Sequence, residues 1–282
     1  MVDSGGFVLS KRRAVRWTKD VVAAAFAQTD ADIYVSLDLP PLPNDTGRRR
    51  RSKIRTSLRN YEFLLGKLPN KTLMPVVHGR TDDEVELSIQ LIRSVTPQPQ
   101  WVGVGGMVPL LQKKYLTPEI SERTPECFIA HVLTRVRRSF PMANIHVFGA
   151  GGTRTFPAVY AFGADSADSI GWRQAAGFGS IFLPMKSQRL VAWPRQSKPP
   201  RKLLDAADLA EIQLCGCPVC AERPALAAKL RAFRRSFLAR SVHNAWTVTN
   251  QASFWPRGRL AMLAAMSNGA LGLDWQKAAS AV

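Results

Sequence analysis

The stretch ADIYVSLD at residues 31–38 indicates the fold class of this 282-residue chain, because it is short, apolar and ends in an aspartate. Similar stretches follow as LMPVVHG at 73–79, WVGVGG at 101–106, NIHVFG at 144–149 and SIFLP at 180–184. Longer segments of helical period separate these predicted strands. Such alternation is typical of parallel βαβ units rather than of a β-sandwich.

The predicted helices cover 18–28 (capped by Thr18), 51–65, 81–95, 125–140 and 156–162. A short strand that ends near Asp168 follows the last of them. If Asp3 ends a further strand, the count is seven, one fewer than a closed eight-stranded barrel needs. We therefore expect an α/β fold of the TIM (β/α)8 type with its first strand missing. An open doubly wound sheet is the competing interpretation.

Three cysteines occur within six positions. Cys215, Cys217 and Cys220 have C-x-C-x-x-C spacing, and His243 follows at the end of a basic helical segment. Three thiolates and one imidazole are the ligand set of a closed tetrahedral zinc site, with no position left for water. We therefore predict one structural zinc (Zn) per chain, with reactive or merely buried thiols as the alternative. The fourth cysteine, Cys127, is expected to be an ordinary buried thiol.

The pattern of strands and helices breaks after residue 184. A proline- and cation-rich stretch, WPRQSKPPRK at 193–202, predicts a loop or linker. We therefore expect two domains. Residues 1–192 would form the barrel catalytic domain without its N-terminal unit, and 193–282 a zinc-binding, basic helical subdomain packed on the barrel.

The charge balance is the strongest compositional signal. The chain has 39 Lys and Arg against 21 Asp and Glu, a net charge of +18. A globular protein this basic is expected to bind a polyanion, with solubility alone as the alternative. The 46% apolar content allows a packed core and excludes wholesale disorder. No apolar run approaches the ~20 residues of a membrane span, so we expect a cytoplasmic protein without a membrane partner.

Two basic helical segments carry candidate phosphate contacts, and a solvated helix face is the alternative interpretation for each residue. The prediction covers Arg48, Arg49, Arg50, Arg51, Lys53 and Arg55 in the first segment, and Arg234 and Arg235, with Lys229, Arg231 and Arg240, in the second.

Polar side chains gather at the predicted carboxyl ends of the strands, where parallel barrels carry their chemistry. Asp3, Asp38, His78 and Asp168 fall there, together with the glycines and aromatic residues Gly105, Gly106, Phe7 and Phe148. Singly, a strand-end Asp is more often a helix cap, and a lone His a core residue. Together, two carboxylates suit a double displacement at an anomeric carbon. Two aromatic rings suit a flipped nucleobase.

In order and strand position, these residues resemble the motifs of the tRNA-guanine transglycosylase superfamily. Its members exchange guanine in nucleic acid for a 7-deazaguanine base. DSGGF at 3–7 is similar to the family's DSGG-aromatic motif, and GADSADS at 163–169 to the segment with the nucleophile. VHG at 77–79 resembles a Q-G element with His in place of Gln, and GGM at 105–107 resembles a GGL element. The resemblance extends to about Trp246.

The resemblance implies a role for each matching residue. Asp168 would be the nucleophile and Asp3 the general base, and the cysteines with His243 would be the zinc ligands. The base-binding residues would be Ser4, Phe7, Asp38, His78, Gly105, Gly106 and Phe148. The partners implied are a nucleic acid (tRNA or DNA) and a 7-deazaguanine of the preQ0 or preQ1 type. A homodimer or a partner subunit completing the barrel is left open.

Three departures from the family pattern bear on the function. The DSGG motif begins at residue 3, whereas the family has a barrel strand before it. DSIGWR at 168–173 is closer to the archaeal and DNA-modifying branches than to the bacterial queuine enzyme. A C-terminal RNA-binding appendage of the archaeal kind is not evident, so we favour the DNA-modifying branch. The alternatives are a non-catalytic nucleic-acid-binding subunit, such as a truncated inactive paralogue, and an N-glycosidic hydrolase.

Overall fold

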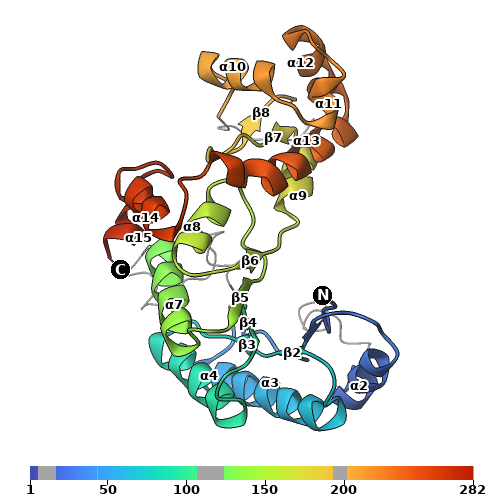
Figure 1. Ribbon diagram of the computed structural model, residues 1–282, viewed down its shortest axis with the longest axis vertical. Helices are drawn as coiled ribbons and strands as arrows, with labels where there is room; N and C mark the ends of the chain where they lie inside the picture. Colours follow the sequence, from blue (N-terminus) through green and yellow to red (C-terminus); the bar gives the residue numbers. More distant parts are fainter. Residues whose placement is uncertain (6–16, 43, 107–123, 193–201, 282) are drawn as a thin grey trace. The chain divides into compact units, whose positions relative to one another are not determined.

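The structure is a computed structural model that describes residues 1–5, 17–42, 44–106, 124–192 and 202–281 (Figure 1). The predicted base contact Phe7 lies outside these residues. The chain divides into two compact units. Unit 1 comprises Met1–Phe148, Phe162–Ala167 and Ser280–Val282, and unit 2 comprises Gly149–Ala161 and Asp168–Ala279. The predicted domains 1–192 and 193–282 stay a prediction.

Unit 1 is built on parallel strands that are neighbours in the order in which they occur in the chain. These are β1 (Tyr34–Val35), β2 (Leu73–Met74), β3 (Val76–Val77), β4 (Trp101–Val104), β5 (Asn144–Val147) and β6 (Ser166–Ala167). β1 pairs with β2, and β3, β4, β5 and β6 pair in sequence. Val2 adds a parallel bridge to Tyr34. Pro75 separates β2 from β3 because it has no N–H for the ladder, although its carbonyl accepts from Gly103.

This sequential parallel order confirms the predicted α/β class and is the order that a β/α barrel requires. The pairs recorded among the described residues do not close a ring, so the full barrel stays a prediction. The expectation of a parallel strand at 180–184 is wrong. β7 (Ser180–Ile181) instead pairs antiparallel with β8 (Arg189–Leu190) in unit 2. The short turn after Leu183 suits a hairpin, whereas a parallel crossover needs a dozen residues or more.

Four helices of unit 1 begin at threonine caps. They are α2 (Lys19–Ala27), α3 (Gly47–Lys67), α4 (Asp82–Val95) and α7 (Pro125–Ser139). In each, the cap hydroxyl accepts a backbone N–H three residues later. Thr46 is the cap of α3, which is why this helix begins before the predicted residue 51. α3 packs beside α4, and α4 beside α7 (Figure 1).

Unit 2 is mainly helical. It contains α8 (Thr155–Ala161), α9 (Gly171–Gly177), α10 (Ala206–Leu214), α11 (Pro218–Ala221), α12 (Leu226–Arg235), α13 (Phe237–Asn250), η1 (Gln251–Phe254), α14 (Arg259–Ser267) and α15 (Leu273–Ser280). The predicted basic helical segment is split, because Ser236 ends α12 and caps α13. The core of unit 2 includes Ile181, Ile212, Cys217, Cys220 and Phe233. Within the described ranges, every helix is too short or too polar to cross a membrane.

Candidate functional site

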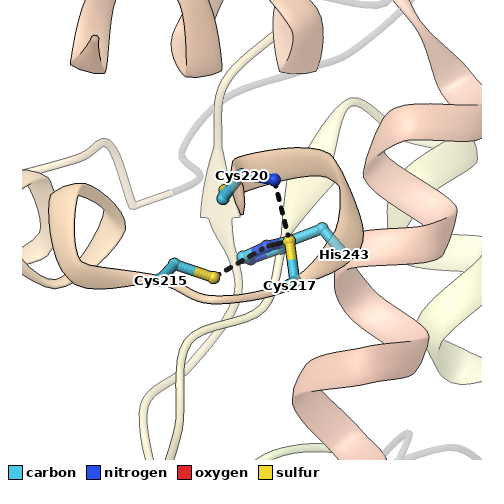
Figure 2. Close-up of side chains that lie close together, drawn as sticks. All are labelled: Cys215, Cys217, Cys220 and His243. Carbon is cyan, nitrogen blue, oxygen red and sulfur yellow. Dashed lines mark hydrogen bonds between the residues drawn. The ribbon is translucent and has the colours of Figure 1, made fainter. Parts of the chain in front are cut away.

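The three clustered cysteines and His243 come together in the core of unit 2. Their four potential ligand atoms lie within 4.8 Å of one another. Figure 2 shows the sulfurs of Cys215 and Cys217 directed at the His243 ring, with Sγ–Nδ1 distances of 3.7 and 3.3 Å. A tetrahedral zinc with ~2.3 Å Zn–S bonds would hold its sulfurs about 3.8 Å apart. The four residues therefore fit a metal ion with soft ligands.

Local sequence explains this convergence. Cys217 is the N-cap of α11, where its sulfur accepts the Cys220 N–H at 3.4 Å. Pro218 takes the first helical position, which needs no N–H donor. This single turn brings three thiols to one side, and α13 supplies the imidazole. Cys217, Cys220 and His243 are at most 1% exposed, whereas Cys215 is partly exposed.

The orientation of His243 is set by its second ring nitrogen. His243 Nε2 lies 2.9 Å from the carbonyl oxygen of Phe182 and donates to it, so that Nδ1 is left for a metal. The neighbouring Asn244 accepts the Phe182 N–H at 2.7 Å and donates to the carbonyls of Trp172 and Ser180. Two consecutive side chains of α13 thus hold both backbone groups of Phe182. The Phe182 and Trp172 contacts of Asn244 were not part of the sequence prediction.

Without a metal, the cluster has to share its protons. Burial disfavours a charged imidazole, but the thiols of Cys215 and Cys217 outweigh it and raise the pKa of His243 to about 9. Hydrogen bonds from Cys215 and Cys220 lower the pKa of Cys217, and contacts with Cys215 and Cys217 raise the pKa of Cys220. A deprotonated sulfur is thus favoured at Cys217, whereas Cys220 and His243 hold their protons more tightly. A divalent cation bound by the cluster would displace those protons.

In unit 1, the structure brings Asp38 and His78 together after their strands. His78 Nε2 lies 2.7 Å from Asp38 Oδ2, and the two side chains are buried. The carboxylate can only accept, so Nε2 carries the proton. The backbone N–H of His78 is bonded to Ser88 Oγ of α4. His78 therefore acts on Asp38 as an internal partner that fixes its carboxylate.

The glycines beside this pair provide close approach. A Cβ on Gly105 would lie 2.4 Å from His78 Cε1, so only glycine fits against the ring. Gly106 has a φ of 81°, a left-handed conformation that favours glycine. On β4, a Cβ on Gly103 would lie 2.7 Å from the Phe148 ring. Phe148 packs edge-on against His146, which the sequence analysis did not single out.

The DSGG motif lies beside Asp38's strand. Ser4 is buried, and its hydroxyl donates to the carbonyl of Ser36 at 3.1 Å. Asp3 is exposed and accepts the N–H of Gly5 at 3.1 Å. The indole of Trp17 donates to the carbonyl of Ser4 at 2.8 Å. This tryptophan is a positioning contact that nothing in the sequence indicated.

In unit 2, Asp168 accepts the backbone N–H of Gly149 at 2.6 Å, and its side chain is exposed. The following residue, Ser169, packs closely on Gly151. A Cβ added to Gly151 would lie 1.5 Å from the Cβ of Ser169, so only glycine fits at this position. The nearby Asp165, in unit 1, instead pairs with Arg137 and accepts the Ile145 N–H at 2.8 Å. Of these two aspartates, Asp165 therefore has a structural role.

The predicted phosphate contacts divide into two groups. Arg48, Arg51, Arg55, Arg234 and Arg235 are exposed. Arg50 instead pairs with buried Glu84 at 2.7 Å, and Lys53 pairs with Asp45 at 2.5 Å. Arg49 is exposed but also reaches Asp45 at 3.0 Å. Lys229 binds the carbonyls that end α10, and Arg240 those of Ala176 and Phe233. Inward-facing cations of both segments therefore stabilise the fold, and burial lowers the pKa of Arg240.

Comparison with known proteins gives the same family as the motifs. A protein of Methanosarcina mazei named tRNA-guanine(15) transglycosylase is 25% identical over 223 residues, 78% of this chain and 40% of that protein. One of Archaeoglobus fulgidus with the same name is 26% identical over 231 residues, again 78% and 40%. No family model matches the chain. The chain thus spans about 40% of the length of these curated relatives, and the resemblance to the superfamily is confirmed.

Proposed function

We propose that this chain is a base-exchange transglycosylase that replaces guanine in nucleic acid with a 7-deazaguanine. The observation that carries the proposal is the difference among the strand-end acids. Asp3 and Asp168 are exposed, and each accepts a backbone N–H of a glycine, whereas Asp38 is buried against His78. Two carboxylates are thus exposed to solvent beside a glycine N–H, and the third is buried and held by a histidine. The archaeal relatives named tRNA-guanine(15) transglycosylase support this assignment.

In the first step, one oxygen of Asp168 attacks C1′ of the target nucleoside. The C1′–N9 bond breaks, guanine leaves with its electron pair, and an aspartyl-glycosyl ester forms. The Gly149 N–H orients the Asp168 carboxylate for this attack. The same donor stabilises the carboxylate when it departs in the second step.

In the second step, the N9–H of the incoming base loses its proton to Asp3. The nitrogen then attacks C1′, and the ester bond to Asp168 breaks, which restores a glycosidic bond. The Gly5 N–H holds Asp3 in place for the proton transfer, and Ser4 fixes the motif to the neighbouring strand. No redox cofactor is required by this sequence of bonds.

Recognition of the base falls to the buried pair and its neighbours. Asp38, oriented by His78, would accept hydrogen bonds from the guanine edge, and Gly105 and Gly106 would present backbone to it. Phe148 would cover one ring face, with Phe7 as the partner that the sequence predicts. Because His78 donates Nε2–H to Asp38, its part in base recognition is to position that carboxylate.

The cysteine cluster would hold one zinc ion with a structural role. Cys215, Cys217, Cys220 and His243 fill all four tetrahedral positions, so zinc would supply folding free energy there and no activated water. Through His243 and Asn244 it would stabilise β7 and the start of α9, the helix that follows Asp168.

The polymer and the protein's partners follow from the same proposal. The names of the relatives make tRNA the first substrate to test. DNA is the alternative, because the departures from the family pattern, taken together, favour the DNA-modifying branch. A homodimer or a partner subunit is part of the proposal only as a possible source of a further barrel strand.

Adduct trapping tests the proposal. The full chain is incubated with guanine-containing tRNA or duplex DNA and denatured, and a covalent protein–nucleic acid adduct is sought. We expect wild-type protein and an Asp165→Asn control to form the adduct, and Asp168→Asn to form none. An adduct with Asp168→Asn would refute the assignment of the nucleophile. Free guanine released without base insertion would indicate a hydrolase, and binding without exchange a non-catalytic subunit.

A further inference from the structure

The outer face of α3 carries a row of arginines that the proposed chemistry does not use. Arg48, Arg51, Arg55 and Arg59 recur every three or four residues and are all exposed, and we refer to them as the arginine stripe. With Ser52 they line an open depression on the surface of unit 1. No acidic side chain lines this depression, and no ion pair is recorded for these four arginines among the described residues.

The opposite side of the same helix shows what the stripe lacks. Arg50 is paired with Glu84, and Lys53 with Asp45, at distances of 2.7 and 2.5 Å. Arg49 also reaches Asp45. Cations that face the unit are therefore neutralised by carboxylates, and the arginine stripe keeps its full charge. Within the part of the chain that the structure describes, one side-chain hydrogen bond is found for the stripe, from Arg59 to Thr56.

The position of the stripe in the helix points to an external anion. Arg48 and Arg51 lie in the first turns of α3, where the helix dipole is positive and no acidic residue occurs in the first turn. Cations there are unfavourable for the isolated fold. An anion bound at this end would gain both from the guanidinium groups and from the helix dipole.

We propose that the arginine stripe is a phosphate-binding track for the backbone of the nucleic acid on which this protein acts. The identity of the polyanion rests on the proposed function. From residue 48 to residue 59 the stripe is about 16 Å long at ~1.5 Å per residue. A duplex of that length carries about ten phosphate charges, so each arginine can meet one. Ser52 adds a hydroxyl donor within the same row.

Salt-dependent binding tests the track. The affinity of the full chain for fluorescent tRNA and for fluorescent duplex DNA is measured by anisotropy at several salt concentrations. The slope of log K against log salt is negative, and each lost phosphate contact reduces its magnitude by about 0.7 to 0.9. R48Q/R51Q/R55Q/R59Q should therefore reduce the magnitude of the slope by about 3. The arm with the larger loss identifies the polymer.

A matched control separates the track from general charge. K67Q/R93Q/R138Q/R257Q removes four other exposed cations and should lower the slope by less than 1. An Arg→Lys version of the stripe should keep the wild-type slope, because it keeps the charge. The melting temperature of the Gln stripe variant should not fall, because the removed cations have no internal carboxylate partner.

The outcomes distinguish the track from the chemistry. A slope whose magnitude falls only with the Gln stripe variant supports the track. If the wild type nevertheless exchanges no base, the proposed function fails and the track still stands. An unchanged slope for the Gln stripe variant on both polymers would overturn the track, and so would an equal loss in the control variant. In those cases adduct formation by Asp168 would still stand.

Discussion

The metal cluster of unit 2 and the strand-end groups of unit 1 are built in opposite ways. The four candidate metal ligands come from one turn and one helix within positions 215–243, and three of them are fully buried. Asp3, Asp38 and His78 come from three separate strand ends, where Asp38 and His78 bond to each other. Most of the cluster is buried, whereas Asp3 is exposed.

This difference separates two kinds of dependence. Buried thiols and an imidazole without a cation leave polar groups in an apolar core, so the cluster should need its ion to be stable. An exposed carboxylate such as that of Asp3 is hydrated by water, so folding does not place its charge in an apolar environment. Loss of the metal should therefore unfold unit 2, whereas loss of a strand-end acid should remove activity and preserve the fold.

The largest effect is expected for Cys217→Ser combined with Cys220→Ser. Structural zinc contributes about 10 to 16 kcal/mol in small peptides, so unit 2 should lose its cooperative unfolding when two buried ligands are removed. Metal analysis should fall from about one zinc per chain to none. Hydrogen exchange should show loss of protection in α13, with unit 1 strands unaffected.

Cys127→Ser is the matched control for this change. Cys127 is half-buried outside the cluster, where its sulfur accepts from the Thr124 hydroxyl at 3.0 Å. It should keep the metal and its protection in unit 2. Retention of metal and stability by the double variant would contradict the structural role of the cluster.

The same contrast explains what the sequence could reveal. The metal cluster was predictable because its ligands are close in sequence and of a distinctive type. The strand ends were predictable because aspartates follow apolar β-branched segments, and the parallel pairing of β1 to β6 confirms those segments. Which cations of α3 face inward and form ion pairs was not predictable from the sequence. The partner of Arg50 is Glu84 of α4, and the partner of Lys53 is Asp45 in the loop before α3.

Two elements were beyond sequence reasoning for a similar reason. The β7–β8 hairpin depends on a partner strand, β8, whose two residues have no periodicity to detect. Asn244 lies next to the predicted ligand His243, but its bonds to Phe182 and Trp172 depend on how α13 packs against α9. Tertiary partners decide both, and they are not encoded in a local pattern.

The second largest effect compares a buried carboxylate in each unit. Asp208 is fully buried between Arg189, 3% exposed, and Lys186, whereas Asp45 pairs with Lys53 and with Arg49, which is 69% exposed. Asp208→Asn leaves a buried guanidinium uncompensated and should cost about 3 to 5 kcal/mol. Asp45→Asn should cost about 1 to 3 kcal/mol, because Arg49 is exposed to water and Lys53 keeps its hydrogen bond to the Pro40 carbonyl. Urea unfolding of both variants measures the difference, and equal costs would contradict it.

Acid stability follows from the same two carboxylates. Burial alone would raise the pKa of Asp208, but hydrogen bonds from Arg189 and Lys186 outweigh it and hold the pKa below its usual value. Lys53 and the Leu42 N–H do the same for the pKa of Asp45. A lowered folded-state pKa contributes stability above the unfolded value of about 3.9, which is lost as pH falls through the folded value.

We therefore expect the urea midpoint to be flat near neutral pH and to fall below about pH 4. Asp208→Asn should reduce the loss of stability at acid pH in unit 2, and Asp45→Asn should do so in unit 1. Hydrogen exchange, measured separately in each unit, reports both changes. A wild-type protein whose midpoint rises on acidification would contradict the lowered pKa of both groups.

The smallest effect tests whether the strand-end pair of unit 1 is as tightly packed as the metal cluster. Gly105→Ala places a methyl group 2.4 Å from the ring of buried His78, so the ring must move or the strand must shift, at about 1 to 3 kcal/mol. Gly106→Ala meets open space, and its left-handed φ alone should cost about 1 kcal/mol. Thermal unfolding compares the two variants. If His78 holds Asp38 rigidly, only Gly105→Ala should also increase hydrogen exchange in β3; the same increase with Gly106→Ala would show that backbone strain, rather than contact with the ring, determines the order of this strand end.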